Sequence, residues 1–172
     1  ASRIAYTEAL GYMPSAWKPY FRIGQAWQGQ NNLPEANKFL RMTLQSNPNF
    51  SPALTMLGNN LKRMGNTDEA EKMLRAAIRS WPMNKYAYDS LAHVLATLDK
   101  RPEAIKMLKN AINIDPNYGV GHANLAMIYS SLNNNKKSLE HLNRAIQLGV
   151  QGPVIDRIKL IVTQKTDQES RK

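Results

Sequence analysis

A period of 34 residues organises the sequence and constrains its fold more than any other feature. Prolines recur at this spacing, at Pro14, Pro48, Pro82 and Pro116. Three further series keep the same register, and they are Ile23, Leu57, Leu91 and Leu125; Ala36, Ala70, Ala104 and Ser138; and Leu40, Leu74, Leu108 and Leu142. Because a fixed period of this length is the signature of a stacked repeat array, we expect each unit to bury its apolar face against its neighbours.

Each unit contains two apolar patterns at helical spacing. In the second unit, Leu54, Leu57 and Leu61 recur as they would on one face of a helix, and Ala70 and Ala77 begin and end a second such pattern. The sequence therefore predicts two helices per unit and an all-α fold.

The break between the two helices of each unit falls on a residue type that tolerates left-handed backbone. The four break positions are Asn31, Gly65, Asp99 and Asn133. Gly, Asn and Asp are the residues that most readily adopt the left-handed conformation that closes a helix. We therefore expect each of these residues to end a first helix, and we expect Pro34 and Pro102 to lie in the first turn of a second helix.

Small residues occupy two slots that face each other in the predicted hairpins. The first helices carry Gly24, Gly58, Ala92 and Ala126, and the second helices carry Ala36, Ala70, Ala104 and Ser138. Only small side chains let two helix axes approach to about 8 Å, so these slots predict the contact inside each hairpin.

The pattern resembles the tetratricopeptide repeat, whose period is also 34 residues. The resemblance implies a right-handed α–α superhelix, a solenoid of helix-turn-helix units over residues 17–50, 51–84, 85–118 and 119–152. It also implies that the chain is a non-catalytic scaffold that binds another protein.

The two ends of the sequence depart from full repeats. Residues 1–16 fit the second helix of a preceding partial repeat or an N-terminal cap. Residues 153–164 are expected to form a capping helix and residues 165–172 a disordered tail. The sequence begins with Ala1, so we expect a cut or processed chain whose targeting segment, and therefore its compartment, is not visible.

The residues that usually carry catalysis do not cluster in the sequence. There is no cysteine, and His93, His122 and His141 occupy three different repeat positions. His122 falls in a slot for large packed residues, and the three tryptophans, among them Trp81, are expected in the core. We therefore expect no enzymatic activity, no metal site and no cofactor.

The family resemblance implies a concave groove lined by the first helices. Its ligand-facing slots hold Arg22, Gln25, Asn59, Arg63, Tyr86, His93 and Asn124. Amide side chains can pair with a peptide backbone, so we expect an extended or helical partner segment here. The Lys and Asn clamp by which some family members bind chaperone tails is not matched in either possible frame.

A second candidate surface lies on the second helices. The formal net charge is +10, and basic residues recur at two slots of the second helices. We call these residues the basic ladder, and they are Lys38, Arg41, Lys72, Arg75, Lys106 and Lys109. An anionic polymer, nucleic acid or membrane surface could dock on it. However, Glu35, Glu69 and Glu103 each precede a ladder lysine by three residues and are expected to pair with it within the helix. A third alternative is self-assembly into a homo-oligomer through the exposed ends of the array.

Overall fold

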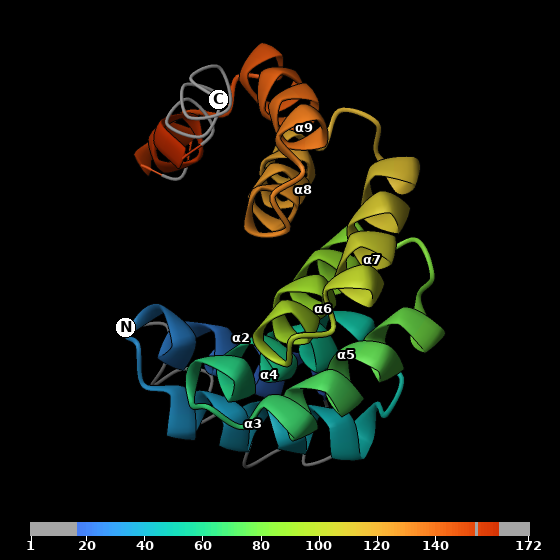
Figure 1. Cartoon of the computed structure of the whole chain (residues 1–172). Coiled ribbons are helices and arrows are strands. Elements are labelled where there is room, and N and C mark those ends of the chain that lie inside the picture. Colours follow the sequence, from blue (N-terminus) through green and yellow to red (C-terminus); the bar gives the residue numbers. More distant parts are fainter. Residues whose placement is uncertain (1–16, 154, 162–172) are drawn as a thin grey trace, which may run out of the picture. The chain divides into compact units, whose positions relative to one another are not determined.

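The computed structural model describes residues 17–153 and 155–161, and every regular element among these residues is a helix (Figure 1). The predictions for residues 1–16 and 165–172 fall outside the described residues. The chain divides into two compact units, Ala1–Val94 and Leu95–Lys172, and each is considered separately below.

The helices of the first unit form successive hairpins. They are α2 (Trp17–Gly29), α3 (Leu33–Ser46), α4 (Ser51–Arg63), α5 (Thr67–Ser80) and the part of α6 (Lys85–Thr97) that precedes residue 95. The second unit contains α7 (Arg101–Ile114), α8 (Gly119–Ser131) and α9 (Asn135–Gln147), followed by helical residues 155–161. Helices α2 and α3, α4 and α5, and α8 and α9 pack as pairs. The prediction of an all-α fold with two helices per 34 residues is confirmed.

The turn inside each hairpin uses left-handed backbone at the predicted residue. The φ angles are 60° at Asn31, 83° at Gly65, 59° at Asp99 and 56° at Asn133. Pro34 and Pro102 lie in the first turn of α3 and α7, where a missing N–H leaves no helical bond unmade. The period therefore specifies the turn geometry as well as the helices.

A glycine permits the close approach inside the second hairpin. A Cβ atom added at Gly58 would lie 2.7 Å from Cγ of Leu74 and 3.3 Å from the carbonyl oxygen of Ala70. The equivalent distances at Gly24 are 3.2 Å to Cγ of Leu40 and 3.4 Å to the carbonyl oxygen of Ala36. The predicted contact between small-residue slots is confirmed in these two hairpins, and a leucine from the second helix covers each glycine.

Each unit has its own apolar core. In the first unit Leu54, Ala77 and Ala87 cluster with half-buried side chains of α3 and α5. In the second unit Ile155 and Ile158 pack with buried residues of α8 and α9, as a capping helix would. None of the helices in the described part of the chain has the length and hydrophobicity needed to cross a membrane.

Candidate functional site

A hollow of about 300 Å³ opens on the first helices of the first unit. Its lining comes from α2, α4, the start of α6 and the connection before α6, and consists of Gln28, Pro52, Thr55, Met56, Asn59, Trp81, Asn84 and Tyr86. Two large rings border it, since Trp81 is 51% exposed and Tyr86 is 60% exposed. We call this feature the Trp81 hollow.

Buried hydrogen bonds hold the wall of the Trp81 hollow in place. The Asn84 amide Nδ2 donates to Oγ of Ser51 at 2.9 Å and to Oγ1 of Thr55 at 3.1 Å. Its Oδ1 accepts from the backbone N–H of Ala87 at 3.3 Å, which fixes the first turn of α6. Asn84 thus ties the connection that carries Trp81, and the helix that carries Tyr86, to α4.

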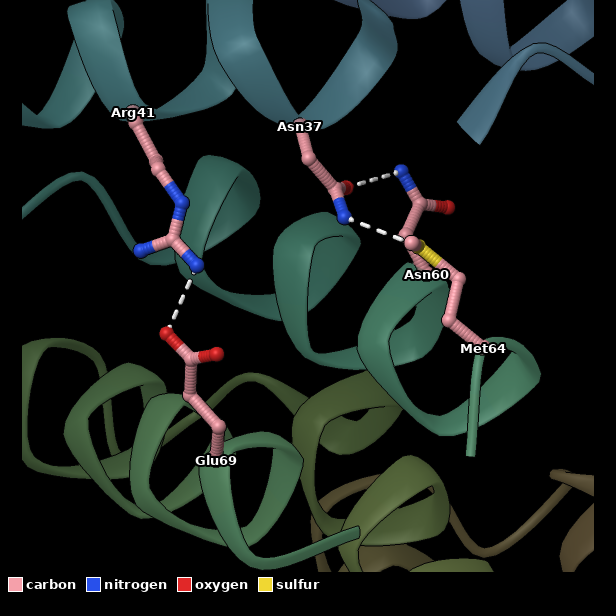
Figure 2. Close-up of polar contacts among 5 residues, drawn as sticks. All are labelled: Asn37, Arg41, Asn60, Met64 and Glu69. Carbon is pink, nitrogen blue, oxygen red and sulfur yellow. Dashed lines mark hydrogen bonds and ion pairs between the residues drawn. The ribbon is translucent and has the colours of Figure 1, made fainter. Parts of the chain in front are cut away.

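A second buried chain of amides fixes the α2 side of the hollow. Nε2 of Gln28 donates to Oδ1 of Asn60 at 2.8 Å, and Nδ2 of Asn60 donates to Oδ1 of Asn37 at 2.9 Å. Figure 2 shows the end of this chain farthest from Gln28, where Nδ2 of Asn37 reaches the sulfur of Met64 at 3.4 Å. Satisfied networks of this kind rigidify the elements they join, so Gln28 is anchored to the body of α3 and α4.

Neutral amides orient the two arginines that the sequence placed on this face. Nη1 of Arg22 donates to Oε1 of Gln25 at 3.1 Å, and both residues lie on α2. Nη2 of Arg63, at the end of α4, donates to Oδ1 of Asn31 in the turn between α2 and α3. Both arginines are exposed, and these bonds position their charges without cancelling them.

The charges of the first unit are divided between its two sets of helices. Helices α2 and α4 contain Lys18, Arg22, Lys62 and Arg63 and have no Asp or Glu. The acids of α3 and α5 are Glu35, Asp68, Glu69 and Glu71. Helices α2 and α4 therefore carry positive charge that no acid of their own balances, whereas α6 carries one acid, Asp89.

His93 and Asn124 differ from the other predicted groove residues. Nε2 of His93 lies 3.8 Å from Oδ2 of Asp89 one turn earlier on α6. Burial lowers the pKa of His93 and Lys62 lowers it further, whereas Asp89 opposes the shift. Asn124, in the second unit, is only 9% exposed, because the packed helix α8 buries most of its residues. It is not the exposed amide that the repeat register led us to expect.

The acids of the second helices neutralise several cations of the predicted basic ladder. Nζ of Lys38 lies 3.9 Å from Glu35, as expected. Glu69, however, contacts Arg41 of the preceding repeat at 2.7 Å rather than Lys72 of its own helix (Figure 2). The expectation for Glu69 was wrong, because the helices α3 and α5 lie close enough for a guanidinium to span them.

Three further ladder residues differ in their surroundings. Arg75 pairs with Glu71 at 2.7 Å across one helical turn. Lys106 and Lys109 are exposed on α7 of the second unit.

The expectation that Trp81 belongs to the core was also wrong. Trp81 follows the last residue of α5, and its backbone N–H caps that helix through the carbonyl of Ala77. Its side chain extends into solvent beside the hollow. The repeat register could have indicated the exposure of Trp81, because the equivalent residues in the neighbouring units are the polar Asn47 and Asp115. An apolar ring therefore occupies a slot that is polar in the neighbouring units.

Two histidines of the second unit form a pair that their sequence positions did not predict. Nδ1 of His122 on α8 lies 3.0 Å from Nδ1 of His141 on α9, and the Tyr129 ring stacks on His141 with an interplanar angle of 2°. Burial is the main cause that lowers the pKa of both histidines. In the described part of the chain, no three His, Cys, Asp or Glu side chains converge as a metal site requires.

Comparisons with known proteins identify the repeat. Models of the tetratricopeptide repeat family match residues 53–81, 86–118 and 121–148. The comparison with curated proteins found no match.

Several solved structures share the fold. A crystal structure of MamA has 17% identity, covers 86% of both chains and gives a TM-score of 0.79. MamA from Desulfovibrio magneticus RS-1 has 19% identity, a TM-score of 0.78, and coverage of 86% of this chain and 83% of its own. The pilF protein of Pseudomonas aeruginosa has 15% identity, a TM-score of 0.85, and coverage of 97% of this chain and 76% of its own. Identities this low establish the shared fold alone.

Proposed function

The chain belongs to the tetratricopeptide repeat family, and on that premise we propose that it is a non-catalytic scaffold that binds a segment of another protein. Stacked helical repeats create extended concave surfaces on which such proteins hold their partners. In this chain the binding surface is the first-helix face of α2, α4 and α6.

The Trp81 hollow is the observation that carries this proposal. Monomeric proteins keep large exposed apolar side chains few and scattered, and contiguous apolar patches mark interaction sites. Here Trp81 and Tyr86 border one hollow, and Met56 lines it. Trp and Tyr are also the residue types that most often dominate the energy of protein interfaces.

Polar groups beside the hollow suit a peptide backbone. Asn59 lines it with an amide that can both donate and accept, and Gln25 lies on α2 beside Arg22. An extended segment would place one side chain in the hollow and satisfy its backbone groups along α2 and α4.

Docking of an anionic surface on the second helices is less favoured. Arg41, Arg75 and Lys38 each have a carboxylate partner within 4 Å, so their field at a distance is reduced. Exposed charges separated by more than about 8 Å are also screened at physiological salt.

Capture of the partner by two surface variants tests the proposal. The groove variant replaces Arg22, Asn59, Arg63 and Tyr86 with Ala, and leaves the buried Asn124 intact. The ladder variant replaces Lys38, Lys72 and Lys106 with Ala. The full-length protein is used as bait in both cases, and circular dichroism checks that each variant is folded.

The groove variant removes two positive charges, and the ladder variant removes three. Loss of the partner by the groove variant alone would therefore not be an effect of total charge. We expect the groove variant to lose the partner and the ladder variant to keep it. If the ladder variant loses the partner while the groove variant keeps it, the anionic-surface function replaces the one proposed here.

A further inference from the structure

We propose that the Trp81 hollow binds one bulky apolar side chain of an acidic peptide segment. This inference rests on the proposed function and specifies the chemistry of the partner. Its two components are an apolar anchor and flanking carboxylates, and separate observations support each of them.

The size and lining of the hollow suit a single side chain. Sites that enclose whole small molecules usually occupy about 300–1,000 Å³, and this hollow, at about 300 Å³, lies at the lower limit. Trp81 and Tyr86 offer ring faces, and Pro52 and Met56 add apolar surface. An aromatic or large aliphatic side chain would therefore replace water against four apolar neighbours.

The wall of the hollow is already positioned for a ligand. Asn84 is 4% exposed and bonds Ser51, Thr55 and the backbone of Ala87 at distances from 2.9 to 3.3 Å. This network fixes the chain on both sides of Asn84, where Trp81 and Tyr86 are carried. A binding site held in its bound form before contact loses less conformational entropy when the ligand arrives.

The charge around the hollow selects an acidic segment. Lys18, Arg22, Lys62 and Arg63 lie on the two acid-free helices α2 and α4, and Arg22 and Arg63 are held by neutral amides. The one acid on α6 is Asp89, which lies 3.8 Å from His93, so the first-helix side of this unit keeps an excess of positive charge. The Lys85 ammonium also lies 5.1 Å from the centroid of the Tyr86 ring, at the edge of the hollow. Complementary charge raises the association rate and excludes wrong partners, so a basic segment would be rejected here.

Selection of peptides from a random 12-residue library displayed on phage tests the proposal. The wild-type protein is the bait at about 0.15 M salt, the ionic strength at which screening is physiological. The selected sequence is then synthesised with a fluorescent label, and its Kd is measured by anisotropy. We expect sequences rich in Asp and Glu around one Phe, Trp, Leu or Met.

A matched pair of protein variants tests the apolar anchor. Trp81→Asn introduces the residue type found at the equivalent Asn47 and keeps the backbone N–H that caps α5. Met83→Asn is the control, because Met83 is 60% exposed in the same connection but does not line the hollow. We expect Trp81→Asn to weaken binding at least about tenfold, as for an interface hot spot, and Met83→Asn to change it less than about twofold.

A second matched pair tests the charge. The double variant Arg22→Gln, Arg63→Gln and the double variant Lys38→Gln, Arg79→Gln each remove two positive charges from the first unit. We expect only the first to weaken the acidic peptide at least about tenfold. A peptide with Ala at its anchor position should lose affinity to a similar extent.

The outcomes distinguish this inference from the proposed function. Two results would overturn the inference and leave the proposed function standing. In the first, the selected peptides are neutral or basic, and the groove variant does not bind them. In the second, the groove variant does not bind the selected peptides, but Trp81→Asn binds them with the Kd of the wild type. An acidic peptide with Ala at the anchor position that binds equally well also overturns the inference. If no peptide is selected, or every peptide binds the groove variant unchanged, both are overturned.

Discussion

Arg41 on α3 and Glu69 on α5 form an ion pair of 2.7 Å between two successive repeats (Figure 2). The pair joins second helices across the repeat boundary. Both side chains remain open to solvent, at 49% and 39% exposure, so water screens the attraction between them. The contact therefore neutralises charge on this face more than it stabilises the fold.

A double-mutant cycle on this pair measures its contribution. The variants are Arg41→Gln, Glu69→Gln and the combination of both. Exposed ion pairs contribute about 0–1 kcal/mol, so we expect a coupling free energy below about 1 kcal/mol in urea unfolding. A coupling of several kcal/mol would show that the pair is a main determinant of repeat stacking.

Gly58→Ala should destabilise the protein although alanine favours helices. The added Cβ would lie 2.7 Å from Leu74 Cγ, so Leu74 or the helix must shift. Overpacking of this kind costs about 1–3 kcal/mol. Gly29→Ala is the control, because nothing lies within 4 Å of its added Cβ. Equal urea midpoints for the two variants would contradict the close approach of α4 and α5.

Gly65→Ala should lower the free energy of unfolding by about 1–2 kcal/mol, because Gly65 has φ of 83° and an alanine is strained there. Gly65→Asn should cost less, since Asn31 and Asn133 adopt left-handed backbone in the same slot. Thermal unfolding followed by circular dichroism compares the two. The order would be reversed if helix propensity, rather than turn conformation, controlled this position.

The histidine pair predicts a pH dependence of stability in the second unit. Burial lowers the pKa of His122 and His141 below 6.5 in the folded state, and Arg144 near His122 and Lys109 and Lys137 near His141 act in the same direction, against Glu140. The unfolded chain therefore binds more protons than the folded chain as pH falls below about 6.5, and the free energy of unfolding decreases.

A register-matched variant isolates this effect. His122→Leu with His141→Met introduces the residues found at Leu54 and Met73 in the second repeat. The free energy of unfolding is measured in urea from pH 7.5 to 5. We expect the wild type to lose more stability than the variant over this range. A difference between the two proteins that does not change with pH would exclude the histidine pair as the cause.

The sequence predicted those features that depend on the period. Left-handed backbone at Asn31 and Asn133 follows from local sterics, and the need for a small residue at Gly58 follows from helix packing. Each depends on residues within one repeat unit, and the sequence contains four such units with similar residues at these positions. The four units could therefore be compared with one another, and this comparison identified turn and packing positions that one unit alone would not have revealed.

The features that escaped prediction depend on distances between helices. The spacing of three residues correctly predicted that Glu35 pairs with Lys38. The same spacing failed for Glu69, because Arg41 on another helix lies within reach of its carboxylate. Likewise, the residue type of Trp81 favours a core position, whereas the structure places it after the end of α5 with half of its surface exposed. His122 and His141 lie on the two helices of one hairpin, and their contact could be predicted only by asking which slots of α8 and α9 face each other.

The most direct test of the central claim locates a bound peptide on the protein. Hydroxyl-radical footprinting compares side-chain oxidation in the isolated protein and in its complex with the library-selected peptide. Trp81 and Tyr86 report on the first-helix face, and the half-buried Phe39 and Met42 on α3 report on the second-helix face. We predict several-fold slower oxidation of Trp81 and Tyr86, with Phe39 and Met42 unchanged. Protection of Phe39 and Met42, with Trp81 and Tyr86 oxidised as fast as before, would contradict the account.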